Sequence, residues 1–103
     1  MKKLFLFIFL SLIFCNVGFS YTIKGSVSCG TIISSYDSDP ALTNGMMTAF
    51  INGYFTGRNY EIDGDVGSGI DNDSMFFALL KYCRENPLKK NYDAAEHIFQ
   101  KLK

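Results

Sequence analysis

The sequence is poor in the residues on which most catalytic sites depend. It has no tryptophan and a single histidine, His97. The motifs of a nucleophilic serine (G-x-S-x-G), a zinc metalloprotease (H-E-x-x-H) and a phosphate-binding P-loop are all absent. No spaced partner accompanies His97, so we expect an ordinary, partly exposed helical histidine rather than a base or a metal ligand. The sequence therefore predicts a protein that is not an enzyme and that uses no cofactor.

Long apolar runs are also missing, except near the N-terminus. Met1–Lys3 is basic, and residues 4–14 carry no charge and consist almost entirely of Leu, Phe and Ile. Small residues, Gly18 and Ser20, follow at the spacing that precedes a cleavage site. This three-part layout is typical of a secretory signal peptide, which we predict over residues 1–20.

A membrane anchor and a lipoprotein signal are two alternative interpretations of the apolar residues 4–14, and both fit less well. A permanent membrane anchor needs about 18 apolar residues or more in a row, and Asn16 interrupts the run too early. A lipid-modified cysteine would need a small residue before Cys15, where Phe14 stands. We therefore expect export of a single small helical domain, residues 21–103, to the periplasm or to the medium.

Cysteine is scarce, with Cys15, Cys29 and Cys83 as its three positions. Cys15 would leave with the signal peptide. The remaining even pair in an oxidising compartment is the pattern of a structural disulfide. In the chain-entropy description, closing the loop between the two cysteines with a disulfide would stabilise the folded state by roughly 4 kcal/mol, because it restricts the unfolded chain. A core of this size supplies only about 3–5 kcal/mol. The alternative is two separately buried free thiols.

The chain lacks an excess of either charge. Ten basic and ten acidic side chains are present, and loss of Lys2 and Lys3 with the signal would leave a net charge of −2. This charge is too small to favour nucleic acid or an anionic membrane surface as a partner. Aromatic residues make up 16% of the sequence, which argues against a disordered chain.

Helical patterns divide the remaining chain into four segments. The first runs from Ser28, a potential cap, to Tyr36, although its Thr, Ser and Ile residues leave a strand open. Asp39 and Pro40 are suited to begin the second helix. The fold class predicted is all-α, a small four-helix bundle.

The third and fourth helices have clear boundaries. One of Asp71, Asn72 and Asp73 can cap the third helix, whose apolar stripe is Phe76, Leu79, Leu80 and Cys83. Pro87 disfavours helical geometry at Asn86 and should end that helix. Asn91 can cap the last helix, which runs from Tyr92 to Leu102. Its inward face is predicted to consist of Ala95, Ile98, Phe99 and Leu102.

The second helix is apolar over much of its circumference. Its stripe is predicted to be Leu42, Met46, Ala49, Phe50 and Tyr54, widened by Met47, Ile51 and Phe55. Gly53 and Gly57 lie four residues apart on one face, and each costs about 1 kcal/mol of helix propensity relative to alanine. We therefore predict that they let another helix approach closely.

A glycine-rich acidic segment, residues 59–72, breaks the helical pattern. The carboxylates around it are Glu61, Asp63, Asp65, Asp71 and Asp73. Clustered carboxylates suit calcium, but counting from Asp63 places Ser68 where an EF-hand needs glycine and Ser74 where it needs a carboxylate. A solvated acidic loop is the favoured interpretation, and cation binding by residues 61–73 stays open.

Four short motifs occur along the chain: Ser28-Cys29, the segment Phe50–Gly57, the run Cys83–Pro87 with its Asn86-Pro87 end, and the Asp-Ala-Ala segment Asp93–Ala95. Together they resemble the motifs of the HdeA/HdeB group of small bacterial periplasmic proteins. The motif residues include Gly53, Tyr54 and Gly57. The resemblance covers residues 28–102.

The HdeA/HdeB resemblance implies a compact all-α domain with one disulfide that matches Cys29 and Cys83. For the best-known members it also implies a homodimer that loosens at low pH and then holds acid-unfolded client proteins, an acid-stress chaperone. Protonation of the carboxylates and His97 would take the charge after residue 20 from −2 to about +9, and self-repulsion would favour opening. The chain differs from these chaperones in its fewer charged residues and in its Gly/Asp loop.

Residues 82–99 are also similar to Rap1a/Tai-type immunity proteins, which neutralise toxins in the periplasm. Those proteins usually carry more cysteines than the pair present here. The expected partner is thus a protein, either unfolded clients or a toxin, with no nucleic acid and no membrane contact after signal cleavage. A structural domain without an assigned role is the third alternative.

Overall fold

The protein is described by a computed structural model that covers residues 25–103. Within this range four helices follow one another: α2 (Cys29–Ser38), α3 (Pro40–Ile62), α4 (Asn72–Glu85) and α5 (Asn91–Leu102). The predicted all-α four-helix class is therefore confirmed. The signal peptide predicted over residues 1–20 lies outside the described residues, as do residues 21–24.

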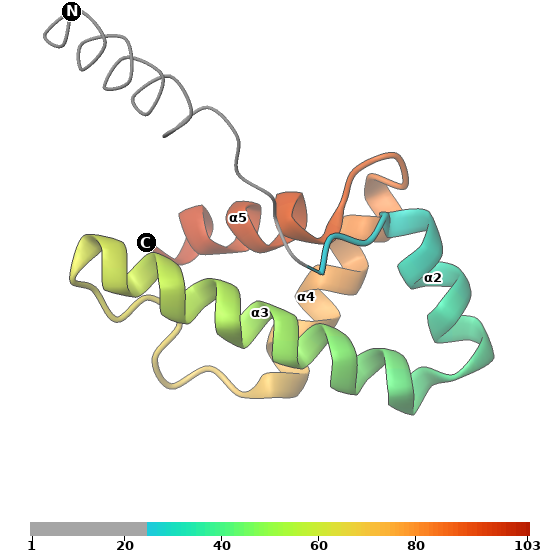
Figure 1. Cartoon of the computed structure of the whole chain (residues 1–103), viewed down its shortest axis with the longest axis horizontal. Coiled ribbons are helices and arrows are strands. Elements are labelled where there is room, and N and C mark those ends of the chain that lie inside the picture. Colours follow the sequence, from blue (N-terminus) through green and yellow to red (C-terminus); the bar gives the residue numbers. More distant parts are fainter. Residues whose placement is uncertain (1–24) are drawn as a thin grey trace, which may run out of the picture.

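The two central helices are α3 and α4. Both α2 and α5 pack against α3 and against α4, and α3 and α4 also pack against each other. In Figure 1, α3 runs across the lower part of the molecule with α5 above it, α4 crosses behind α3, and α2 stands at the right-hand end. The disulfide-bearing ends of α2 and α4 thus meet at one end of the bundle.

Side-chain caps begin three of the helices at the predicted positions. Ser28 Oγ accepts a hydrogen bond from Thr31 N (3.2 Å), and Asp39 Oδ1 accepts one from Leu42 N (3.2 Å). Asp71 Oδ1 caps α4 through Ser74 N (2.7 Å). These bonds satisfy amide groups that the first helical turn leaves without a partner.

Helix α5 begins differently from the prediction. The N-cap is Lys90 rather than Asn91, and Lys90 N–H donates to Asp93 Oδ2 at 3.0 Å. Asn91 is the first helical residue and its side chain is fully buried. The side-chain amide of Asn91 makes hydrogen bonds outside the helix, and Lys90 occupies the N-cap position instead.

The core draws apolar side chains from all four helices. Its buried members are Cys29, Ile32, Met47, Ile51, Phe55, Met75, Phe76, Leu79, Leu80, Cys83, Ala94, Ala95, Ile98 and Phe99. The stripe predicted for α4 is confirmed. In α5, Ala95, Ile98 and Phe99 face inward as predicted, but Leu102 is 41% exposed because it lies in the last turn, beyond the packed part of the helix.

The buried face of α3 is narrower than predicted. Its buried side chains are Thr43, Met47, Ile51 and Phe55. The prediction that Leu42, Met46 and Ala49 belong to the core is wrong, since all three are exposed. A polar side chain occupies a core position instead, because Thr43 Oγ1 donates to Asp39 O (2.9 Å) and thereby satisfies its hydroxyl.

Helix α3 is also longer than predicted. It continues through Asn59 to Ile62 rather than ending before the acidic segment. Arg58 and Glu61 face each other across one turn, with Nη1 and Oε2 2.7 Å apart, which supports the added turn. The acidic loop is therefore reduced to residues 63–71.

Backbone geometry fixes the ends of this loop. Asp63 ends α3 in the left-handed conformation (φ 54°). Asn59 binds Val66 in both directions, accepting from Val66 N (2.8 Å) and donating to Val66 O (2.9 Å). Gly67 has φ +87°, and a Cβ there would lie 2.9 Å from the Phe55 ring. Only glycine allows the loop to lie this close to the core.

Gly53 and Gly57 do not mediate a close helix contact. Both are exposed, and a Cβ built at either position meets no atom within 4 Å. The prediction of a tight helix approach at these glycines is wrong. They lie on the side of α3 opposite the buried Ile51 and Phe55. Helical spacing places the two glycines on one face of the helix, but no other helix packs on that face.

Within residues 25–103, no helix is both long enough and apolar enough to span a membrane.

We expect Gly53→Ala to raise the free energy of unfolding by about 0.5–1 kcal/mol, because alanine costs less backbone entropy in an open helical position. Urea denaturation measures this change. Gly67→Ala is the contrasting variant and should lower stability, because its positive φ and the Phe55 ring both oppose a Cβ. Loss of stability in Gly53→Ala would show that this glycine has a packing partner after all.

Candidate functional site

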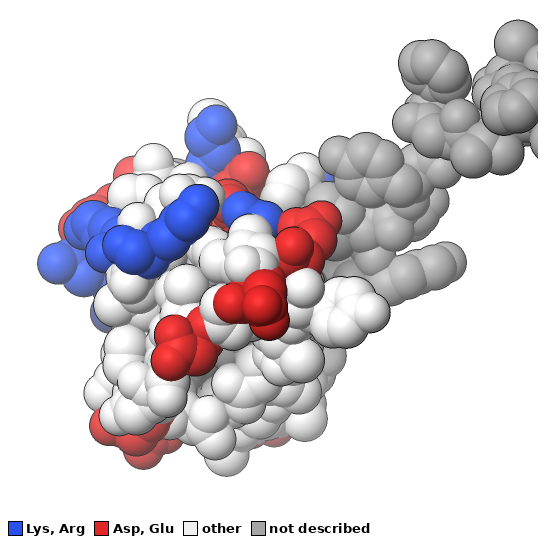
Figure 2. All heavy atoms as spheres, turned by 90° about the vertical axis from the view of Figure 1, so that its left-hand side faces the viewer, with Lys and Arg blue, Asp and Glu red and all other residues white. Residues whose placement is uncertain are grey.

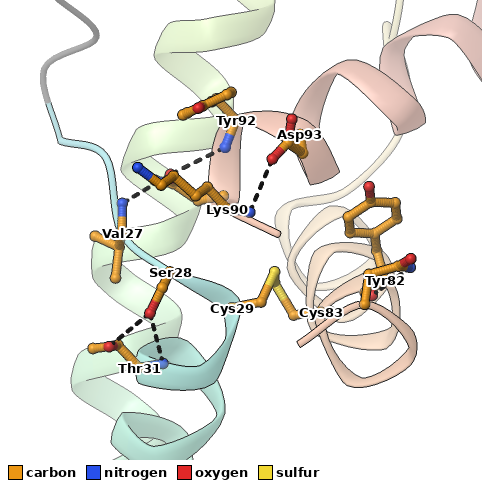
Figure 3. The surroundings of a disulfide bond; sticks show 11 residues. Val27, Ser28, Cys29, Thr31, Tyr82, Cys83, Lys90, Tyr92 and Asp93 are labelled. Carbon is orange, nitrogen blue, oxygen red and sulfur yellow. Dashed lines mark hydrogen bonds between the residues drawn. A yellow bond between two sulfur atoms is a disulfide. The ribbon is translucent and has the colours of Figure 1, made fainter. Parts of the chain in front are cut away.

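A disulfide joins the first residue of α2 to the last turn of α4. Cys29 and Cys83 are bonded, with their Cα atoms 4.7 Å apart and a sequence separation of 54 positions. Both side chains are fully buried. Figure 3 shows the bond between the two helices, with the turn that leads to α5 beside it. The predicted pairing is confirmed, and the alternative of two separate thiols is wrong.

Backbone contacts strengthen the same junction. Cys29 N–H donates to Lys89 O at 2.8 Å, which ties α2 to the turn between α4 and α5. A Cβ on Gly30 would lie 3.7 Å from Pro87 O, in ordinary contact. Asn86 Nδ2 donates to Tyr82 O at 3.0 Å and closes the end of α4. The Asn-Pro motif therefore shapes the turn that supports the disulfide.

Asn91 connects the segment before α2 to α5. Its Oδ1 accepts from Val27 N (3.0 Å) and Tyr92 N (3.0 Å), and its Nδ2 donates to Gly25 O (2.8 Å). Its own N–H donates to Val27 O at 2.9 Å. A fully buried amide with these partners holds the chain in place ahead of the disulfide. From the sequence, only a helix-capping role is predicted for Asn91.

A charged cluster links α3 to α5. The Arg58 guanidinium donates to both carboxylate oxygens of Glu96, from Nε (3.0 Å) and Nη2 (2.8 Å). Tyr54 Oη donates to the same carboxylate at 2.6 Å. Arg58 also pairs with Glu61 and lies over the Phe99 ring, 4.8 Å from its centre. Bidentate pairing and ring contact fix the orientation of the guanidinium.

The cluster shifts the protonation equilibria of its members. Hydrogen bonds from Arg58, aided by Tyr54 and Gln100, lower the pKa of Glu96 to about 2 although partial burial opposes this change. Burial, then the hydrogen bond to Glu96, raises the pKa of Tyr54 above its ordinary range. Glu96 thus keeps its charge in acid that neutralises an ordinary glutamate. Tyr54 serves this cluster rather than a glycine packing motif.

An apolar groove of about 230 Å³ lies between α2 and α3. Its main lining residues are Val27, Ile32, Thr43, Met46 and Met47. Met46 lines the groove and is 56% exposed, and Leu42, one helical turn before Met46 in α3, is 59% exposed. The groove together with Leu42, hereafter the α2–α3 surface, presents a methionine and a leucine side chain to solvent.

A second groove, of about 290 Å³, lies between α4 and α5. Three of its lining residues are apolar, Ala78, Ile98 and Leu102, and we call these its floor; the others, Lys81, Tyr82, Glu85, His97 and Lys101, we call its rim. The His97 ring packs on Tyr82, with the ring centres 5.0 Å apart. His97 is exposed, as predicted. We refer to this feature as the α4–α5 groove.

The acidic segment serves mainly to end and begin helices. Glu61 lies in α3, Asp63 ends that helix and Asp71 begins α4. The hydrogen bonds from Ser74 lower the pKa of Asp71. Among residues 25–103, no group of three or more His, Cys, Asp or Glu side chains is placed to hold a metal ion. The loop and α3 border a groove of about 300 Å³ near Asn52, Asp65 and Ser68.

The residues singled out from the sequence fall into separate places. Cys29 and Cys83 meet, and Asn86 and Pro87 lie beside them. Gly53 and Gly57 face open space on α3. The Arg58–Glu96 pair escaped prediction, because the two residues lie 38 positions apart and no local spacing connects them.

Comparison of the chain with known protein families, with curated proteins and with solved structures finds no match.

Replacing Cys29 and Cys83 by serine is expected to lower the free energy of unfolding by roughly 4 kcal/mol, because the unfolded chain regains the freedom of a long loop. Thermal and urea unfolding under non-reducing conditions measure the loss. A double variant that melts no earlier than the parent protein would contradict a stabilising role for the bond. Reduction of the parent protein should reproduce the effect of the double variant.

Glu96→Gln is expected to lower stability by about 1 kcal/mol at pH 7, since the carboxylate is partly solvent-screened. The folded pKa of about 2 lies below the ordinary value of 4.5. The stabilisation is therefore complete above pH 4.5 and disappears as the pH falls towards 2. Melting curves from pH 7 to pH 2 should show the two proteins converging in acid.

Glu61→Gln is the matched control for this cluster, because Glu61 pairs with the same arginine but is 67% exposed. It should change the melting temperature less than Glu96→Gln does at pH 7. A pH-independent gap between Glu96→Gln and the parent protein would contradict the assigned linkage.

Proposed function

We propose that this chain is an exported, non-enzymatic protein-binding domain that acts as an HdeA-like periplasmic chaperone and holds unfolded proteins in acid. The observation that supports this proposal is the α2–α3 surface. Leu42 and Met46 are largely exposed there, beside an apolar groove. Large exposed apolar side chains that border a groove are typical of surfaces that bind other proteins.

The chemistry of the α2–α3 surface suits varied clients better than one fixed partner. Methionine is unbranched and polarisable, so the exposed Met46 can adapt to apolar segments of different shape, beside the buried Met47 that also lines the groove. Flexible methionine-rich surfaces are a common feature of promiscuous binders. An unfolded protein offers such segments without regular structure, and the groove of about 230 Å³ can receive one side chain at a time.

The framework behind this surface is suited to acid. Disulfides persist in oxidising compartments such as the periplasm, and the covalent bond is unaffected by protonation. Glu96 keeps its charge until the pH approaches its pKa of about 2, so α3 stays linked to α5 while the net charge rises. Repulsion between the added positive charges can then loosen other contacts and expose more apolar surface.

An immunity protein that neutralises a periplasmic toxin is the second candidate. The α4–α5 groove favours it, because Lys81, Glu85 and Lys101 set a fixed charge pattern around an apolar floor. Fixed charge patterns give specificity for one partner. A toxin gene next to the gene for this chain would support the inhibitor, and an isolated acid-stress locus would support the chaperone.

The double variant Leu42→Ser and Met46→Ser should reduce suppression of client aggregation at pH 2–3 several-fold. It removes apolar contact area at two exposed positions, where substitutions usually change stability by no more than about 0.5 kcal/mol. Light scattering of an acid-unfolding client, with the protein at several-fold excess, measures the effect.

Leu88→Ser provides the matched control, because Leu88 is 98% exposed in the turn between α4 and α5 and does not line the groove. Its suppression should equal that of the parent protein. No suppression by the parent protein at several-fold excess would rule out the chaperone, and equal activity of all variants would exclude the α2–α3 surface.

A further inference from the structure

The α4–α5 groove combines an apolar floor with cations on both walls. Ala78 from α4 and Ile98 and Leu102 from α5 provide the floor. Lys81 stands on the α4 wall and Lys101 on the α5 wall. Basic side chains from two helices therefore border one apolar depression.

These lysines are not committed to other ion pairs. Among residues 25–103, both ion pairs use Arg58, with Glu61 and with Glu96. Lys81 and Lys101 are exposed and have no carboxylate within ion-pair distance. Figure 2 shows the end of the molecule where α3 and α5 finish, with basic side chains gathered at the upper left and acidic ones across the middle.

We propose that the α4–α5 groove binds an extended acidic peptide segment in which carboxylates flank one apolar side chain. The apolar side chain lies on the floor against Ala78, Ile98 and Leu102, where it is removed from water. The flanking carboxylates pair with Lys81 and Lys101. Protein interfaces commonly combine a buried apolar anchor at the centre with charged and polar contacts at the rim.

The size of the groove favours a single peptide side chain over a whole free fatty acid. A volume of about 290 Å³ is at the lower limit of pockets that enclose a whole small molecule, but it suffices for one side chain. Glu85 also lines the groove, so the flanking carboxylates of the peptide must lie beside Lys81 and Lys101 and away from Glu85. The Glu85 carboxylate can accept a hydrogen bond from a peptide N–H.

This site is independent of the chaperone proposal. The α2–α3 surface lies on a different pair of helices and shares no lining residue with the α4–α5 groove. Variants of the groove should therefore leave suppression of client aggregation unchanged, so failure of one proposal is distinguishable from failure of the other.

The test is an NMR titration of the ¹⁵N-labelled, disulfide-bonded protein at pH 7 with blocked three-residue peptides. The probes are acetyl-Glu-Leu-Glu-amide, its Lys-Leu-Lys counterpart and octanoate. The acidic peptide should shift the amide signals of Ala78, Lys81, Tyr82, Ile98 and Lys101. Raising the salt to 0.5 M should weaken binding, since rim charges are screened (about 3–10 Å Debye length over this range).

Lys81→Glu should weaken binding of the acidic peptide at least tenfold, and Lys101→Gln should weaken it by a smaller factor. Lys89→Glu is the matched control, because it makes the same charge change at an exposed position that does not line the groove. It should bind like the parent protein. The circular dichroism of each variant confirms that the helices are retained.

Three results would overturn the proposal. The first is absence of groove shifts at millimolar acidic peptide. The second is equal binding of the acidic and basic peptides, which would exclude recognition by charge. The third is binding of octanoate without binding of peptide, which would assign the groove to a free fatty acid.

Discussion

The covalent tie between Cys29 and Cys83 is the constraint on which the rest of this fold depends. The described domain is small, and its core is formed by a limited set of side chains shared among four helices. Helix α2 contributes Cys29 and Ile32 to the buried set, and Ile33 and Tyr36 pack against the same core. The disulfide, the bond from Cys29 N to Lys89 O and the Asn91 contacts together fix α2 at its first residue. Helix α2 is therefore held by its N-terminal junction as well as by its apolar face.

A second, non-covalent tie acts at the other end of the bundle. Arg58, Glu96 and Tyr54 connect the last turns of α3 to α5, where the core is formed by Phe55 and Phe99 in edge contact. The two ties differ in chemistry and therefore in what breaks them. The disulfide responds to reductants and not to pH, whereas the charged cluster responds to strong acid and to salt. As the pH falls, other carboxylates of the molecule can therefore be neutralised while the disulfide and the charged cluster still hold the helices together.

Local patterns in the sequence predicted local features of the structure. Caps at Ser28, Asp39 and Asp71, the end of α4 before Pro87 and the α4 stripe all follow from interactions within a few residues. The errors concern choices that distant residues decide. Helix α3 is apolar on two adjacent faces, and packing against α2 and α4 selects the face with Met47, Ile51 and Phe55 over the one with Leu42 and Met46. Asn91 and the Arg58–Glu96 pair could not be recognised, because their partners lie tens of residues away.

The face that packing did not select is the one with functional potential. Burying Leu42 and Met46 would have stabilised the monomer, yet the chain places Thr43 in the core and leaves these two side chains in water. Exposed residues of this kind lower solubility unless they bind a partner. On the other pair of helices, the α4–α5 groove of about 290 Å³ combines apolar side chains with Lys81, Glu85 and Lys101. The two grooves share no lining residue, so the partners that we propose for them would not compete for the same side chains.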